Sequence, residues 1–259
     1  MKKSLVGLLL LSLLFLGSTL FAAEEFGYKI AESGIILKVK NNLYLVEPSV
    51  IRVGNYLAYF AGKDSTSKKD MTVGRKKSVK VVVDKPDRKI VQLVCSLKDL
   101  KGNILKDYEL ELNLEIRRDL PCLIMMSKFR YLGGDRVLCV MNWGISGSLE
   151  YYSVPERGKV VTRKLPGIGR ITRRTKIGIK PWIYAHAGKG KGIGLITSGL
   201  LGKQEDFIYV NYVKGRSQRK RLERGKSMDL FMIFLPIEKG GTKPIASLYE
   251  RVRNIEWNY

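Results

Sequence analysis

The chain contains one histidine, His186, and its neighbours indicate what it could do. Trp182 and Tyr184 precede it at intervals of two residues. In an extended strand, residues two apart lie on one face, so these three side chains would share a face. Such rings can stack on the apolar face of a sugar, and an imidazole can move a proton at neutral pH. The same grouping also suits the interior of a β-sandwich, so both interpretations stay open.

Two basic clusters flank this strand. The stretch from 156 to 180 holds nine Lys and Arg residues and no acid after Glu156, and the stretch from 214 to 226 holds seven with one acid. Arginine forks bind carboxylates and phosphates in a bidentate manner. The candidate anion ligands within these clusters are Arg173, Arg174, Arg219 and Arg221.

The net charge of the whole chain points the same way. Lys and Arg number 47 against 24 Asp and Glu, a formal charge of +23. Such an excess implies an anionic partner: acidic polysaccharide, an anionic cell-envelope polymer, a membrane surface or nucleic acid. A basic bias of the source proteome would explain the charge equally well.

Residues 1–23 are typical of a secretory signal peptide. Lys2 and Lys3 precede an apolar run from Leu5 to Leu16, and the small residues Ala22 and Ala23 mark the predicted cleavage site. The run is short for a membrane span, which needs roughly 20 residues. We therefore predict a secreted or periplasmic protein with no stable membrane span after cleavage. Nucleic acid then becomes an unlikely partner, and residues 24–259 form one domain.

Three other patterns argue against common chemistries. Glu109, Glu111 and Glu115 share one strand face, but their spacing suits a solvated face rather than a glycosidase carboxylate pair. The glycine-rich stretch 188–194 lacks the ending of a nucleotide-binding loop and precedes a strand. The three cysteines, Cys95, Cys122 and Cys139, do not have the spacing of metal ligands, so we predict no metal or cofactor. We interpret them as small buried hydrophobic residues rather than as partners in a disulfide bond.

Strand-like segments with short turns fill most of the chain and predict an all-β fold. The clearest runs from Tyr108 to Arg117, with one dry and one wet face. Its register with the returning strand follows from charge and apolar matching. The predicted pairs are Tyr108–Tyr131, Glu109–Arg130, Leu110–Phe129 and Glu111–Lys128. The polar stretch from Gly62 to Lys77 is expected to be an exposed loop.

The end of the chain changes period. Ile245, Leu248 and Val252 follow helical spacing, with Thr242 as a possible N-cap and Pro244 in the first turn. We predict a short C-terminal α-helix that packs on the sandwich.

The closing strands carry a resemblance to a known group. An apolar strand at 182–188 ends in a glycine-rich turn, a second follows at 192–197, and a Leu-x-x-Gly-x-Ser turn at 222–227 starts a third that ends at Pro236. This pattern, mainly over residues 104–236, resembles the galactose mutarotase-like, glycoside hydrolase-type supersandwich domains. The resemblance implies a large antiparallel β-sandwich. Enzymes of that group use His and Glu residues, whereas this chain has a single histidine, His186, and no second one.

The sequence thus predicts an exported carbohydrate-binding β-sandwich protein, non-catalytic and favouring anionic polysaccharide. Its ligand platform would be Trp182, Tyr184 and His186, surrounded by Arg173, Arg174, Arg219 and Arg221. One alternative is a carbohydrate-active enzyme, an epimerase, polysaccharide lyase or glycoside hydrolase that uses His186 or Tyr184. The other is an envelope scaffold protein that binds anionic surface polymer.

Overall fold

The computed structural model describes residues 25–165, 176–177, 180–188, 190–197, 208–209, 217–255 and 257. The predicted signal peptide, Arg173 and Arg174 lie outside these ranges. Within them, no helix has the length and apolar character needed to cross a membrane.

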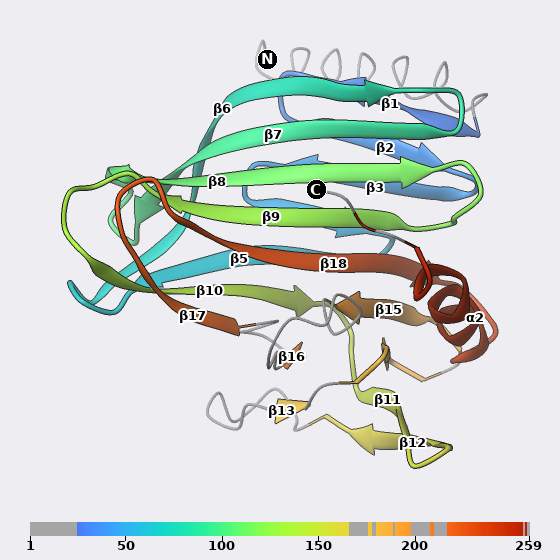
Figure 1. Ribbon diagram of the computed structural model, residues 1–259. Helices are drawn as coiled ribbons and strands as arrows, with labels where there is room; N and C mark the ends of the chain where they lie inside the picture. Colours follow the sequence, from blue (N-terminus) through green and yellow to red (C-terminus); the bar gives the residue numbers. More distant parts are fainter. Residues whose placement is uncertain are drawn as a thin grey trace, which may run out of the picture.

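Two layers of antiparallel strands form the body of the protein (Figure 1). The first layer begins with five strands joined by short turns and continues through β10, which pairs with β5, to β17 at its edge. Its strands are β1 (Phe26–Ile30), β2 (Ile35–Val39), β3 (Asn42–Glu47), β4 (Val50–Val53), β5 (Tyr56–Asp64), β10 (Val137–Ser146) and β17 (Ser217–Leu222).

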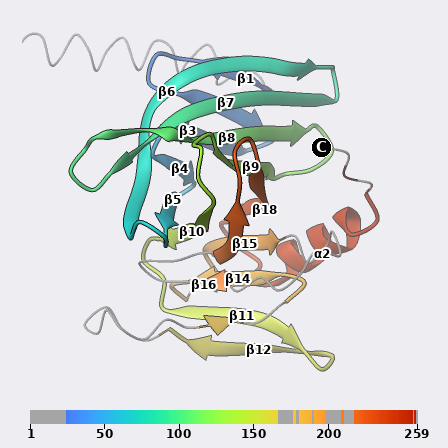
Figure 2. The same cartoon turned by 60° about the vertical axis from the view of Figure 1, so that its left-hand side comes forward.

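The second layer lies in front of β2 and β3 in Figure 1. Strand β6 pairs with the end of β5 and so carries the chain from one layer into the other. In spatial order the strands are β6 (Lys69–Asp84), β7 (Arg88–Asp99), β8 (Ile104–Arg117), β9 (Leu123–Tyr131), β18 (Ser227–Ile237), β15 (Gly192–Thr197), β14 (Ile183–His186), β11 (Tyr151–Glu156) and β12 (Lys159–Lys164). Figure 2 shows the β11–β12 hairpin at the end of the molecule opposite β6 and β7. A separate short pair joins β13 (Lys176–Ile177) to β16 (Ile208–Tyr209).

The main core lies between the layers, as period-two alternation requires. Phe60 and Trp143 of the first layer meet Phe129 of the second, with ring centroids 6.1 Å apart for Phe60–Phe129 and 5.9 Å for Phe60–Trp143. The Trp143 indole Nε1 donates to Ser127 Oγ at 3.0 Å, so its one polar atom is satisfied in the core. Burying side chains of this size stabilises the fold by about 1.5–3 kcal/mol each.

A second, smaller core lies on the outer face of the second layer. Helix α2 (Lys243–Val252) buries Ile245, Leu248 and Val252 against the apolar residues of β9, β14, β15 and β18. Gly194 of β15 makes this contact possible, because a Cβ there would lie 2.7 Å from Ile245 Cδ1. Thr242 precedes the helix as predicted, but its side chain makes no capping hydrogen bond. The sandwich with a C-terminal helix therefore matches the predicted fold class.

The register predicted for the central hairpin is confirmed. Tyr108 lies opposite Tyr131, Glu109 opposite Arg130, Leu110 opposite Phe129 and Glu111 opposite Lys128. The expectation that the other face is wet was wrong, because Glu111 is 6% exposed and Glu115 is fully buried. Alternation shows on which face of the strand a side chain lies, but it does not show whether other parts of the protein cover that face.

The expectation that residues 62–77 form an exposed loop was also wrong. β5 extends to Asp64 and β6 begins at Lys69, so the stretch is mostly strand. Met71 and Val73 are 2% and 1% exposed and anchor this part of β6 to the core. Two inward apolar residues are enough for a strand whose other side is charged, and so the polar composition was misleading.

All three cysteines are free and buried, which confirms their interpretation as small core residues. Burial raises the pKa of Cys95 and that of Cys139 to about 12. These thiols are therefore poor nucleophiles at neutral pH.

Candidate functional site: the polar face of the second layer

The predicted platform residues lie on β14 or, for Trp182, directly before it, and two of the three are covered. Trp182 is 5% exposed and Tyr184 is 2% exposed, and both pack in the smaller core beneath α2. They do not form an exposed platform, because the helix occupies the surface their rings would offer. Only His186 remains half-buried at the edge of this core.

The His186 ring is held on both sides and at both nitrogens. It stacks between Tyr184, with centroids 4.7 Å apart, and Tyr151, with centroids 5.5 Å apart. The backbone N–H of Gly188 donates to Nδ1 at 3.2 Å, which places the proton of the neutral ring on Nε2. Nε2 lies 3.3 Å from Ser153 Oγ.

This arrangement holds the imidazole neutral without activating the serine. Burial lowers the pKa of His186, which favours the neutral ring. Since Nε2 carries the proton, it cannot accept one from Ser153 Oγ in this geometry. Ser153 Oγ also bonds Thr162 Oγ1 at 2.8 Å.

The predicted arginines are not gathered around His186 in the described residues. Arg219 and Arg221 lie on β17 of the first layer, opposite Val140 and Leu138 of β10. His186 lies on the second layer. Arg173 and Arg174 fall outside the described residues.

A different set of polar side chains forms a continuous ladder on the outer face of the second layer. Gln92 Nε2 of β7 donates to Asn113 Oδ1 of β8 at 3.2 Å, and Asn113 Nδ2 donates to Glu111 Oε1 at 3.1 Å. Arg130 Nη2 of β9 lies 2.7 Å from Glu111 Oε2, and Lys128 Nζ lies 3.9 Å from Oε1. We call these five residues the polar face.

A buried ion-pair cluster borders the polar face. Glu115 accepts from Arg88 Nε at 2.8 Å and Nη2 at 3.1 Å, and from Arg117 Nε at 2.6 Å. The Arg117 guanidinium lies 5.0 Å from the centroid of the Trp257 ring, which packs on Phe231 at 5.0 Å. Pairing is what allows a carboxylate to be fully buried here.

Sequence reasoning missed the polar face because polar residues that alternate with apolar ones along β8 are typical of a solvated strand face. The acid–base matching across β8 and β9 was the signal that could have found it. Each member is half-buried or buried and takes part in a hydrogen bond or an ion pair, so the face is preorganised.

Among the described residues, every carboxyl group whose pKa departs clearly from its ordinary value has a lowered pKa. Hydrogen bonds from Arg163 and Lys180 hold the pKa of Glu156 at about 2. A hydrogen bond from Lys89 lowers the pKa of Asp84, and one from Asn103 lowers that of Asp99. A general acid needs the opposite shift.

Comparison with known proteins identifies the fold. No protein-family model matches the sequence, and no curated protein matches it. Among solved structures, the glycoside hydrolase family 36 α-galactosidase AgaB from Geobacillus stearothermophilus aligns over 86% of this chain and 42% of its own, with 9% identity and a TM-score of 0.55. An AgaA A355E D548N variant in complex with raffinose, from the same organism, aligns over 73% and 31%, with 12% identity and a TM-score of 0.51.

A third structure, a putative aldose 1-epimerase from Escherichia coli K12, aligns with 11% identity over 83% of this chain and all of its own. Its TM-score of 0.38 supports no further inference. The chain spans about 31–42% of the two galactosidases. At these identities the likeness concerns the fold, and the predicted resemblance to glycoside hydrolase-type sandwich domains is confirmed at that level.

Proposed function

We propose that this chain is an exported carbohydrate-binding β-sandwich protein that is non-catalytic, favours anionic polysaccharide and binds it on the polar face. The observation that carries the proposal is the hydrogen-bonded ladder from Gln92 through Asn113 and Glu111 to Arg130. Its planar groups are oriented before any ligand arrives, which lowers the entropy cost of binding.

The spacing of the ladder suits an extended glycan. Gln92, Asn113 and Arg130 come from three neighbouring strands, and neighbouring strands lie roughly 4.8 Å apart. A glycan that crosses the strands would meet a polar group at each step. Amides and guanidinium groups keep further donors and acceptors after pairing with one another, so hydroxyl pairs can bind to them.

The charge of this surface favours an acidic glycan. The polar face and its ion-pair cluster contain four cations and two carboxylates. Two further acids lie beside them: the exposed Asp229 opposite Lys128, and Glu109, which lies opposite Arg130 and pairs with Lys77. The cations are Arg88, Arg117, Lys128 and Arg130, and the carboxylates are Glu111 and Glu115. The overall charge of +23 acts in the same direction.

The geometry supports binding over turnover. Glu111 and Glu115 are four residues apart on one strand, roughly 13 Å, beyond the separation that either glycosidase mechanism uses. The enzyme alternative depends on His186 and Tyr184, and their hydrogen bonding and burial offer a substrate no proton acceptor. The scaffold alternative needs no ordered polar face, and the ladder therefore favours a glycan ligand.

The test is binding of residues 24–259 to neutral and acidic polysaccharides at low and high salt, with assay of new reducing ends and unsaturated products. We expect salt-sensitive binding to acidic glycans without turnover. Asn113→Ala and Gln92→Ala should weaken binding while leaving the buried charges paired, and Lys159→Ala, exposed on β12 at the opposite end of the molecule, serves as the control.

The outcomes separate the three functions. Product release would overturn the proposal in favour of an enzyme. Binding that depends on salt but is equal in wild type, Asn113→Ala and Gln92→Ala would indicate charge adhesion alone, as a scaffold protein would show.

A further inference from the structure

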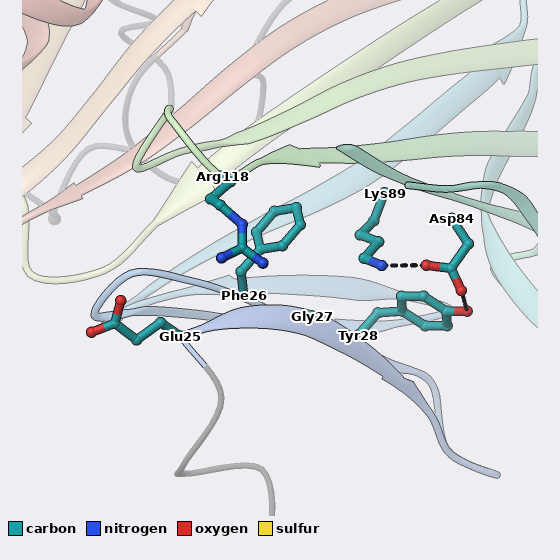
Figure 3. Close-up of a pocket in the computed structure, with 7 residues that line it drawn as sticks. All are labelled: Glu25, Phe26, Gly27, Tyr28, Asp84, Lys89 and Arg118. Atoms are coloured by element: carbon teal, nitrogen blue, oxygen red, sulfur yellow. Dashed lines mark hydrogen bonds and ion pairs between the residues drawn. The ribbon is translucent and has the colours of Figure 1, made fainter. Parts of the chain in front are cut away.

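A pocket of about 470 Å³ lies at an edge of the sandwich, and its lining residues Lys89 and Arg118 directly follow Arg88 and Arg117 of the ion-pair cluster in sequence. It is lined by residues 25–28 of the first layer, by Asp84 and Lys89 beside the β6–β7 turn, and by Arg118 after β8 (Figure 3). The edges of the two layers meet here.

Arg118 is fixed in place at one wall of the pocket. Its backbone N–H donates to Asp87 O at 2.9 Å, and its Nε donates to Pro86 O at 3.0 Å. Its guanidinium carbon lies 5.2 Å from the centroid of the Phe26 ring, and Phe26 is itself anchored in the core. These contacts leave its two terminal nitrogens without a partner among the described residues, as a fork already oriented for an anion.

The opposite wall is electrically neutral. Lys89 Nζ pairs with Asp84 Oδ1, and Tyr28 Oη donates to Asp84 Oδ2 at 3.0 Å. The hydrogen bond from Lys89 lowers the pKa of Asp84, so the carboxylate stays ionised and retains lone pairs for further donors.

The remaining carboxylate does not neutralise Arg118. Glu25 is exposed and makes no ion pair with it, and in Figure 3 its carboxylate points away from the guanidinium. The pocket therefore offers one oriented cation and one acceptor group on facing walls.

We propose that this pocket binds a uronate residue, the carboxylated sugar of an acidic glycan, separately from the polar face. The terminal nitrogens of Arg118 would hold the uronate carboxylate in a bidentate pair. Asp84 would accept hydrogen bonds from sugar hydroxyls, which distinguishes a uronate from a simple anion. The choice of a sugar acid rests on the proposed function, whereas the anion-binding geometry does not.

The experiment titrates residues 24–259 with galacturonate, galactose and inorganic phosphate, followed by NMR chemical shifts. We expect galacturonate to shift signals of the pocket, with much weaker effects from galactose and phosphate. Arg118→Ala should weaken galacturonate binding about tenfold or more, since hydrogen bonds to charged groups are the strong ones. Arg118→Lys keeps the charge without the fork and should recover only part of the affinity.

The matched control is Arg136→Ala, an exposed arginine whose ion pair with Glu223 is at the surface. Unchanged galacturonate binding in Arg118→Ala, or a wild-type protein that binds phosphate as well as galacturonate, would overturn the uronate site. Binding of polygalacturonate is measured in the same variants. If the polymer binds wild type and Arg118→Ala equally and the monomer binds neither, the pocket proposal fails while the proposed function stands; if neither ligand binds any form, both fail.

Discussion

The outer face of the second layer has two halves built on the same strands. One half is apolar and covered by α2, and the other is polar and accessible. Toward one end, Ile124 of β9 and Ile233 of β18 lie opposite each other beneath α2. Toward the other end of the same strands, Lys128 lies opposite Asp229 and remains accessible. One strand face can therefore be core at one end and accessible surface a few residues further on, depending on where the helix covers it.

The largest expected effect comes from the helix-covered half. Ile245→Ala removes a fully buried side chain that packs on Gly194, and it should destabilise the protein by about 2–5 kcal/mol. Urea unfolding measures the change, and Lys243→Ala, exposed on the same helix, is the control. Equal midpoints for the two variants would mean that the helix is not part of the cooperative fold.

The next largest expected loss of stability comes from the polar half. Glu115→Gln keeps the shape but removes the charge that Arg88 and Arg117 share, and should cost about 1.5–3 kcal/mol. Glu109→Gln, whose partner Lys77 is exposed, should cost only about 0.2–1 kcal/mol. A larger loss in Glu109→Gln would contradict the contrast between buried and surface ion pairs.

A smaller stability effect should accompany a clear binding effect in the ladder. Asn113→Ala removes two hydrogen bonds and should cost about 0.5–1.5 kcal/mol in unfolding experiments. The exposed Asn254→Ala should change neither stability nor glycan binding. If Asn113→Ala loses stability but keeps full binding, the ladder is a structural feature only.

The smallest effect is a pH dependence at the border between the halves. Because burial lowers the pKa of His186, the unfolded chain binds a proton more readily than the folded one. This contribution to stability is fully present above the ordinary pKa of 6.5 and declines as the pH falls through the lower folded value. Comparing wild type with His186→Asn between about pH 7 and 5 should show a shallower decline in the variant; parallel curves would contradict it.

Local patterns predicted much of the fold. Alternating residues gave the β8–β9 register residue by residue, and helical spacing at Ile245, Leu248 and Val252 gave the helix. These features depend on neighbours in sequence or on one adjacent strand.

The site could be predicted far less well, for a physical reason. Trp182 and Tyr184 were correctly placed on one face with His186, yet the helix that buries them lies some sixty residues later in the chain. Glu115 looks solvated from its alternation, and its burial depends on arginines of two strands. Burial by distant segments is determined by tertiary packing, and the periodicity of the local sequence carries no information about it.

The position of β18 has a consequence for how the protein folds. This late strand, Ser227–Ile237, inserts between β15 and β9, and β9 (Leu123–Tyr131) comes much earlier in the chain. Until it arrives, β9 and β15 present unpaired backbone edges that can join other chains. Such long-range pairing closes slowly, so the second layer can be completed only after nearly the whole chain has been made. A nascent chain that lacks β18 should accordingly be the species most prone to aggregate.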